Sequence, residues 1–390
     1  MLSDKDIEKY LYKYQKRQDD FFLLFLVTTA KRLEENSRIQ SVDKIFSMSE
    51  AFKYTHDINT IKKAQKQLKM DQLDVLRSDL YEIANIVYTE ARELYGEESP
   101  TLKGNSEMFR LVSGEIELAL ASLSALIDRP VFVVNGRIYD PVDAYNQATQ
   151  LALQTKQYSG KLLSMQRAIT PILDSRLRYM SNYTNSDGTP LIRDVRAVRM
   201  NVLSSIKQVM NEVGNLVKDQ VQTDGIELSA HAFPAPDHAP AQGHQFTNEE
   251  FDKMQSGEDF VDIQGRSYEG FERNIGQWNC RHYVKPIKIG KTKPEYTDKE
   301  LQQILDENER GYTTSDGRHY TLYECTQVQR GYERKIRECK ERCIVSKAMG
   351  DKTTYNLYNG KAKQLLTQYK TFSNACGIPA KMERTRVAQY

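Results

Sequence analysis

A chain of 390 residues has room for two or three domains, and the apolar patterns within its polar composition (28% charged, mean hydropathy −0.65) exclude a disordered protein. Residues 281–390 hold 22 Lys and Arg against 13 Asp and Glu, a net charge of +9. The formal net charge of the whole chain is only +2, so the preceding residues carry −7. This asymmetry permits contact with nucleic acid or an acidic protein surface, and a solvated surface explains it equally well. The five cysteines are sparse and odd in number, which argues against a disulfide framework and suits a reducing cytoplasm.

The first third of the chain is predicted to be helical. Apolar residues at three- and four-residue spacing predict helices over residues 3–36, 58–95 and 107–127, with Gly96 ending the second. The apolar run from Phe21 to Val27 is too short to span a bilayer, so we expect a buried helical segment, no membrane span and no signal peptide.

The middle of the chain carries one hairpin signal. Asn135-Gly136 between β-prone residues predicts a type I′ turn in a hairpin near 131–139. A helix over 142–169 should follow, with a kink or restart at Pro171. The polar stretch 181–190 is typical of a loop, and we expect a domain boundary near it.

A helix over 191–222 and a short strand over 226–229 are expected next. Arg193, Arg196 and Arg199 recur every three residues along one side of that helix. They are either solvated or paired with an anion, in another subunit or as a carboxylate of the fold.

In the C-terminal part of the chain we expect a short helix over 299–309, capped near Thr297, and a loop at 315–318. Amphipathic spacing from Leu322 to Gly350 and from Tyr355 to Phe372 predicts an αα-hairpin. The predicted fold class is therefore mainly α with a small α+β module: long N-terminal helices, an irregular β-rich core containing His, Cys and Trp, and a C-terminal helical hairpin. The expected regions are 1–185, helical with the hairpin; 186–295, the α+β module; and 296–390, the helical hairpin.

An irregular segment, residues 226–283, contains four of the six histidines, the only tryptophan and the first cysteine; we call it the polar island. His231, His238, Cys280 and His282 are residue types that bind zinc or another borderline metal. Their spacing matches no zinc-finger signature. The alternative is a hydrogen-bonded polar core, in which the histidines tie loop backbones together and no cofactor is bound.

Enzymatic signatures are absent from the sequence. It has no glycine-rich phosphate loop, no HExxH motif and no paired-carboxylate pattern, and only Cys280 with His282 offers a local nucleophile and base. Cys339 and Cys343 could donate two metal ligands, but both lie on an apolar stripe and are expected to pack in the core. Basic residues between Arg330 and Arg342 alternate with glutamates, which favours a solvated face over a DNA-binding track.

Several motifs of the second half occur in the order found in the phage minor capsid protein 2 family of tailed bacteriophages. They begin with Ser229-Ala230-His231, Pro236-Asp237-His238 and Gln242-Gly243, and continue with Gly276-Gln277-Trp278-Asn279-Cys280-Arg281-His282. Tyr323 to Arg330 and Tyr369-Lys370-Thr371-Phe372-Ser373 complete the set. The chain resembles this family over residues 191–387. The resemblance departs where an arginine expected before Pro236 is replaced by Ala235.

The resemblance implies a non-enzymatic structural protein of the virion, a minor capsid protein of the head near the portal vertex. It implies a role in assembly or genome delivery, synthesis in the host bacterial cytoplasm, multiple copies per virion, and contacts with portal protein, major capsid protein or packaged DNA. It also implies that Ser229, Gln242, Gly243, Trp278, Asn279 and Arg281 belong to the structural core of the module. The alternative is a virion-carried enzyme, a transferase or peptidase, that uses residues 229–282 as its active site.

Overall fold

The computed structural model describes residues 4–39, 47–93, 102–221, 223–271, 273–275 and 280–388. This part of the chain is mainly helical with small antiparallel sheets, as the sequence predicts. It divides into two compact units: unit 1 comprises residues 1–12, 74–123 and 199–327, and unit 2 comprises residues 13–73, 124–198 and 328–390. Each unit takes segments from all three regions expected from the sequence, and that three-part division stays a prediction.

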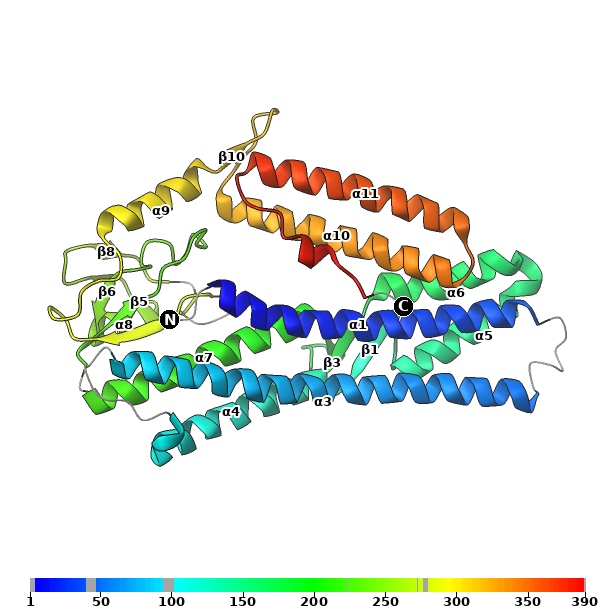
Figure 1. Cartoon of the computed structure of the whole chain (residues 1–390), viewed down its shortest axis with the longest axis horizontal. Coiled ribbons are helices and arrows are strands. Elements are labelled where there is room, and N and C mark those ends of the chain that lie inside the picture. Colours follow the sequence, from blue (N-terminus) through cyan, green and yellow to red (C-terminus); the bar gives the residue numbers. More distant parts are fainter. Residues whose placement is uncertain are drawn as a thin grey trace. The chain divides into compact units, whose positions relative to one another are not determined.

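Long helices dominate the N-terminal part of the chain (Figure 1). They are α1 (Asp4–Ser37), α3 (Met48–Glu93) and α4 (Ser106–Ile127), with a short 3-10 helix η1 (Leu102–Gly104) before α4. The second helix begins well before the predicted residue 58, with Glu50 in its first turn, where a carboxylate interacts favourably with the helix dipole. Gly96, the predicted stop, lies outside the described residues.

The Asn-Gly hairpin of unit 2 is confirmed. β1 (Pro130–Val134) pairs antiparallel with β2 (Arg137–Tyr139), and Asn135 and Gly136 have φ of 51° and 77°. A type I′ turn requires positive φ at both of these positions. The pair belongs to a four-stranded sheet of order β2-β1-β3-β4.

The loop predicted at 181–190 is confirmed only for its central part, because residues 181–184 and Pro190 belong to the strands of a second hairpin. β3 (Arg178–Thr184) pairs antiparallel with β4 (Pro190–Asp194), so only residues 185–189 form the connecting loop. α7 (Arg196–Val221) consequently starts later than the predicted residue 191. Tyr179 of β3 is fully buried and donates a hydrogen bond to Gln18 of α1, a long-range contact that local composition does not encode.

The helix predicted over 142–169 is interrupted, but not at the proline. α5 (Pro141–Ser159) and α6 (Lys161–Ser175) are separated by Gly160, which has φ 75° and ψ 167° and cannot continue a helix. α6 runs through Pro171.

The apolar run at Phe21–Val27 lies within α1, and most of its side chains are buried, as predicted. Phe25 stacks on Phe132 of β1 with ring centroids 4.6 Å apart. No helix among the described residues has the length and apolar character needed to cross a membrane.

The C-terminal αα-hairpin is confirmed. α10 (Leu322–Ala348) and α11 (Lys352–Ala375) lie side by side, and the segment with the 3-10 helix η2 (Met382–Thr385) follows α11 (Figure 1). Tyr369 of α11 is fully buried and donates a hydrogen bond of 2.8 Å to Glu333 of α10. Cys339 and Cys343 are buried on α10, in agreement with the predicted core role.

Small strands and two short helices form the rest of unit 1. β5 (Gly225–Leu228) is the middle strand of a sheet of order β6-β5-β9, with β6 (Gln245–Thr247) and β9 (Val284–Ile287). α8 (Asn248–Ser256) follows β6 directly and was not predicted, although Thr247 and Glu250 form a capping box at its start. The remaining elements are β7 (Phe260–Val261), β8 (Ser267–Tyr268), α9 (Asp298–Arg310), β10 (Tyr312–Thr313) and β11 (His319–Tyr320).

Candidate metal centre

The register of β5 and β9 brings the two ends of the polar island together. The strands pair antiparallel, with Leu228 opposite Val284. Beyond the strands, the Ser229 N–H donates to the Tyr283 carbonyl and the Tyr283 N–H donates to the Ser229 hydroxyl, both at 3.0 Å. Residues 229–231 and 280–282, remote in sequence, are thereby held side by side.

The loop between β5 and β6 is fixed by its own polar groups. The His231 N–H donates to the Gln242 side-chain oxygen at 3.1 Å, and the Gly243 N–H donates to the Leu228 carbonyl at 2.8 Å. Gly243 has φ 73°, and a Cβ atom there would lie 2.3 Å from Leu301. Glycine is therefore needed for both the backbone conformation and the close approach of α9.

His238 is held rigidly in this loop with no exposed surface. Its Nε2–H donates to the Arg273 carbonyl at 2.5 Å. The Arg273 guanidinium in turn donates two hydrogen bonds, of 2.8 and 2.9 Å, to the Asp237 carboxylate. Because Nε2 carries the proton, Nδ1 of His238 has a lone pair available for a second partner.

That partner is Cys280. Its Sγ atom lies 3.4 Å from Nδ1 of His238 and 3.4 Å from Nδ1 of His282. The exposed fractions of the three residues are 0% for His238, 3% for Cys280 and 1% for His282, and one ligand atom from each lies within 4.8 Å of the others. Three of the four predicted metal candidates are therefore brought together.

His231, the fourth candidate, is not part of this three-residue group. Its ring centroid lies 4.6 Å from that of His282, while its Nδ1 atom is 3.1 Å from the Ala232 carbonyl oxygen. His231 thus borders the group.

The two central histidines have opposite pKa shifts. Burial lowers the pKa of His282 well below its usual value, and the nearby His231, His238 and Lys207 lower it further. Burial also acts to lower the pKa of His238, but hydrogen bonds with Cys280 and the Arg273 carbonyl outweigh this effect and raise it. The Nε2 atom of His282 is buried without a hydrogen-bond partner among the described residues.

Two of the residues that support the group, Lys207 and Glu8, were not indicated by any sequence pattern. Lys207 of α7 is 1% exposed, donates to the Arg281 carbonyl, and lies 5.0 Å from the centroid of the Tyr283 ring. The Arg281 guanidinium donates to Glu8 at 2.9 Å. Arg199 donates to the same Glu8 oxygen at 2.6 Å, and Arg196 pairs with Asp194 at 3.1 Å, so two arginines of the predicted row pair with carboxylates of the fold. These contacts join segments far apart in sequence.

Of the residues assigned to the structural core by resemblance, Ser229, Gln242, Gly243 and Arg281 make the contacts described above. Trp278 and Asn279 lie outside the described residues, so their assignment stays a prediction. All five cysteines are buried and none is disulfide-bonded.

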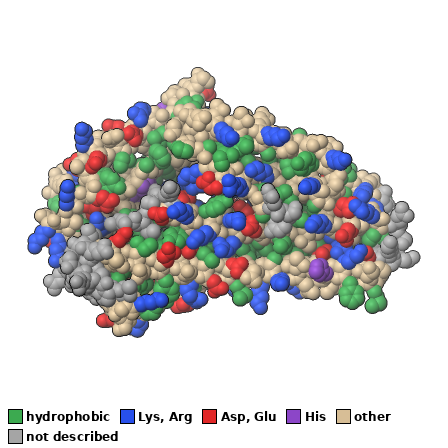
Figure 2. Space-filling model, viewed as in Figure 1, with side chains coloured by type: hydrophobic (Ala, Val, Ile, Leu, Met, Phe, Trp, Pro, Cys, Tyr) green, Lys and Arg blue, Asp and Glu red, His purple; other side chains and the backbone are tan. Residues whose placement is uncertain are grey.

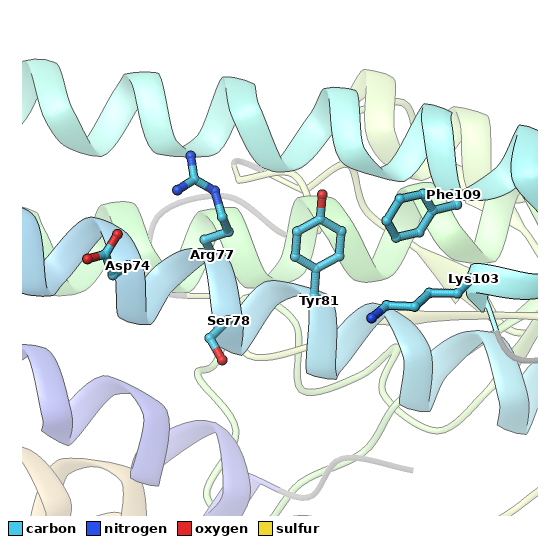
Figure 3. A pocket seen from close by; sticks show the side chains of 6 residues that line it. All are labelled: Asp74, Arg77, Ser78, Tyr81, Lys103 and Phe109. Carbon is cyan, nitrogen blue, oxygen red and sulfur yellow. The ribbon is translucent and has the colours of Figure 1, made fainter.

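A separate surface depression of about 420 Å³ lies between α3 and α4 (Figure 3). Two of its polar side chains contact α4: Arg77 pairs with Glu117 at 3.3 Å, and the Tyr81 hydroxyl donates to Ser113 at 2.9 Å. Tyr81 also stacks on Phe109 with centroids 5.6 Å apart. The depression therefore has the character of a helix–helix contact.

Comparison with known families decides what kind of protein carries this island. The model of the phage minor capsid protein 2 family matches residues 58–374, which is most of the chain and includes the whole polar island. The chain belongs to the phage minor capsid protein 2 family. Comparisons with curated proteins and with solved structures each found no match.

Membership of the phage minor capsid protein 2 family identifies the chain as a structural component of a bacteriophage virion, with other virion proteins as its partners. The match confirms the resemblance drawn from the sequence motifs and extends it into α3, where no motif had been recognised.

Proposed function

We propose that this minor capsid protein belongs to the phage head near the portal vertex, where it contacts portal protein, major capsid protein or both. It acts there in head assembly or genome delivery through protein–protein contacts, in several copies, after synthesis in the host cytoplasm. The observation that carries this proposal is the family match over residues 58–374.

Exposed apolar side chains on the helices support a role in protein–protein contact. Met48 and Phe52 are 79% and 71% exposed and lie four residues apart at the start of α3. Leu111 and Leu118 are exposed seven residues apart on α4. Both spacings place the two side chains on one helix face, which a partner helix could cover.

Contact with packaged DNA receives less support. On the face shown in Figure 2, Lys and Arg side chains are interspersed with Asp and Glu. On α10, Arg337 and Lys340 each donate a 2.6 Å hydrogen bond to carbonyls near the C-terminus, and Arg342 pairs with Asp174. Arg334, Lys335 and Lys347 are exposed on the same helix, so a contact of α10 with the phosphate backbone would fall mainly on these three.

The alternative of a virion-carried enzyme would use the Cys280 thiol with His238 as its base, since the two atoms lie 3.4 Å apart. A nucleophile must be reached by its substrate, and Cys280 is only 3% exposed. This burial favours a structural role for the pair.

Mass spectrometry of purified virions, and of heads separated from tails, tests the proposed location. We expect the chain in heads, with cross-links to portal or major capsid protein when particles are treated with a lysine-reactive reagent. Recovery of the chain only from tails, or only from lysate outside the particles, would contradict the proposal. Phage carrying Cys280→Ala tests the enzyme alternative: loss of a measurable turnover with normal assembly would favour it.

A further inference from the structure

We infer that His238, Cys280 and His282 bind one Zn²⁺ ion through the two Nδ1 atoms and the cysteine sulfur. The site is structural and independent of where the protein lies in the virion. It holds the loop between β5 and β6 against the segment before β9.

The two sulfur–nitrogen distances fit zinc coordination. A Zn–S bond of about 2.3 Å and a Zn–N bond of about 2.0–2.1 Å, at a tetrahedral angle, place sulfur and nitrogen roughly 3.5 Å apart. The two sulfur–nitrogen separations here are both 3.4 Å. Two imidazole nitrogens and one thiolate sulfur also favour zinc over harder divalent cations such as Mg²⁺ and Ca²⁺, which bind oxygen ligands.

The surroundings of His238 match those of a metal ligand. A ligating histidine normally donates its second ring N–H to a carbonyl or carboxylate, which fixes the tautomer and the ring orientation. The Nε2–H of His238 donates to the Arg273 carbonyl, and Asp237 clamps Arg273 in place. This arrangement leaves the Nδ1 lone pair directed towards Cys280.

Weak hydrogen bonds alone are the alternative arrangement of the group. A thiol has one proton and is a weak donor, so Cys280 can donate to only one of the two Nδ1 atoms, and the other imidazole would then donate from Nδ1 to the sulfur. In both arrangements Nε2 of His282 is buried without a partner among the described residues, so this atom does not distinguish them. The metal content of the protein does.

The backbone preorganises the three ligands before the ion binds. Cys280 and His282 precede β9, and the paired hydrogen bonds between Ser229 and Tyr283 hold this segment beside the start of the His238 loop. Little conformational entropy is then lost when the ion binds. The fourth position would be taken by solvent or, after a small shift, by His231, whose ring lies against that of His282.

Metal content of the full-length protein, produced without a histidine tag and dialysed after exposure to zinc, tests the inference. We expect one zinc per chain by elemental analysis. We expect Cys280→Ser to lose it and Cys339→Ser, which alters another buried thiol away from the island, to retain it. Zinc-free wild-type protein that remains folded would overturn the inference, as would a Cys280→Ser variant with undiminished zinc.

Cobalt substitution keeps the test valid if Cys280→Ser fails to fold. Co²⁺ added to zinc-depleted wild-type protein should produce the intense visible bands of tetrahedral coordination and a thiolate-to-cobalt charge-transfer band, both displaced by one equivalent of Zn²⁺. Only the weak bands of octahedral cobalt, with no thiolate band, would contradict the site.

Discussion

The guanidinium of Arg281 donates a 2.9 Å hydrogen bond to the carboxylate of Glu8, although 273 residues separate them in the chain. Arg199 donates to the same carboxylate oxygen at 2.6 Å. The first turns of α1 are thereby tied to the polar island and to α7 within unit 1. One carboxylate neutralises two arginines, and its side chain is only 16% exposed.

Glu8→Gln should therefore destabilise unit 1 by about 1–2 kcal/mol, because it removes the negative charge that two partly buried guanidinium groups share. This range lies between the values for exposed and for buried ion pairs. Urea denaturation monitored by circular dichroism measures the change. Glu117→Gln is the matched control, since the Arg77–Glu117 pair is exposed on both sides and should contribute below about 0.5 kcal/mol. Equal losses in the two variants would show that the Glu8 contacts add no particular stability.

Gly243→Ala should be more damaging than an equivalent change at another glycine with positive φ. Both Gly243 (φ 73°) and Gly265 (φ 83°) carry the backbone strain of a left-handed residue, about 1 kcal/mol for alanine. Only at Gly243 does the new Cβ also meet Leu301, at 2.3 Å, and overpacking adds about 1–3 kcal/mol. Thermal unfolding of the two alanine variants separates strain from steric overlap. If Gly265→Ala had the lower unfolding midpoint, the overlap with Leu301 of α9 would not be what makes alanine unfavourable at Gly243.

Asp262 should contribute stability that disappears in acid. Burial by itself raises the pKa of this carboxyl, but the backbone N–H and guanidinium of Arg266 outweigh it, so the folded pKa lies below the usual 3.8. The unfolded chain then protonates at higher pH than the folded chain. The contribution is complete above about pH 4 and is lost as the pH falls through the folded pKa.

Asp262→Asn tests this dependence. The variant keeps an oxygen that accepts the Gln264 and Arg266 backbone N–H groups, but it removes the charge and replaces the oxygen that accepts from the Arg266 guanidinium by an NH2 donor, and should cost about 1–3 kcal/mol at pH 7. The difference from wild type should shrink between pH 4 and pH 2 in denaturant titrations. Asp252→Asn, at an exposed position on α8, should leave the profile unchanged. A difference that stays constant down to pH 2 would contradict the assignment.

Tyr369→Phe should weaken the C-terminal helical hairpin of unit 2. The Tyr369 hydroxyl donates to Glu333 at 2.8 Å and accepts the Lys381 N–H at 2.8 Å. Removing it takes one hydrogen-bond partner from the buried Glu333 carboxylate, which keeps its ion pair with Arg384, and one from the Lys381 N–H, at a cost of about 1–3 kcal/mol. Hydrogen exchange of amides in α10 and α11 should accelerate in this variant. Tyr358→Phe keeps its ring beside Arg342 and serves as the control, with no expected change in protection.

Local patterns in the sequence determined most of the helical structure. Three- and four-residue spacing predicted α1, α4, α10 and α11, because side chains at this spacing lie on one face of a helix, and that face is buried. Asn135-Gly136 predicted the hairpin because few residues tolerate two consecutive positive φ values. The same local reasoning missed β3 and β4, since the partner that makes Tyr179 a buried strand residue is Gln18, far away in the chain. It also placed the helix break at Pro171 instead of Gly160, where the backbone conformation ends the helix.

At the candidate metal centre, too, the sequence identified the candidate residues and the tertiary structure determined which of them come together. Composition alone singled out His231, His238, Cys280 and His282, because histidine and cysteine gathered in one irregular segment are seldom needed to fill a helical core. The sequence could not select among the four, since their spacing matches no local ligand motif. The tertiary structure made that selection: the pairing of β5 with β9 and the clamp of Asp237 on Arg273 bring two imidazoles to one sulfur, and leave His231 beside them. The geometry of such a group depends on contacts between segments that are far apart in the sequence. It therefore cannot be predicted from the local spacing of the residues.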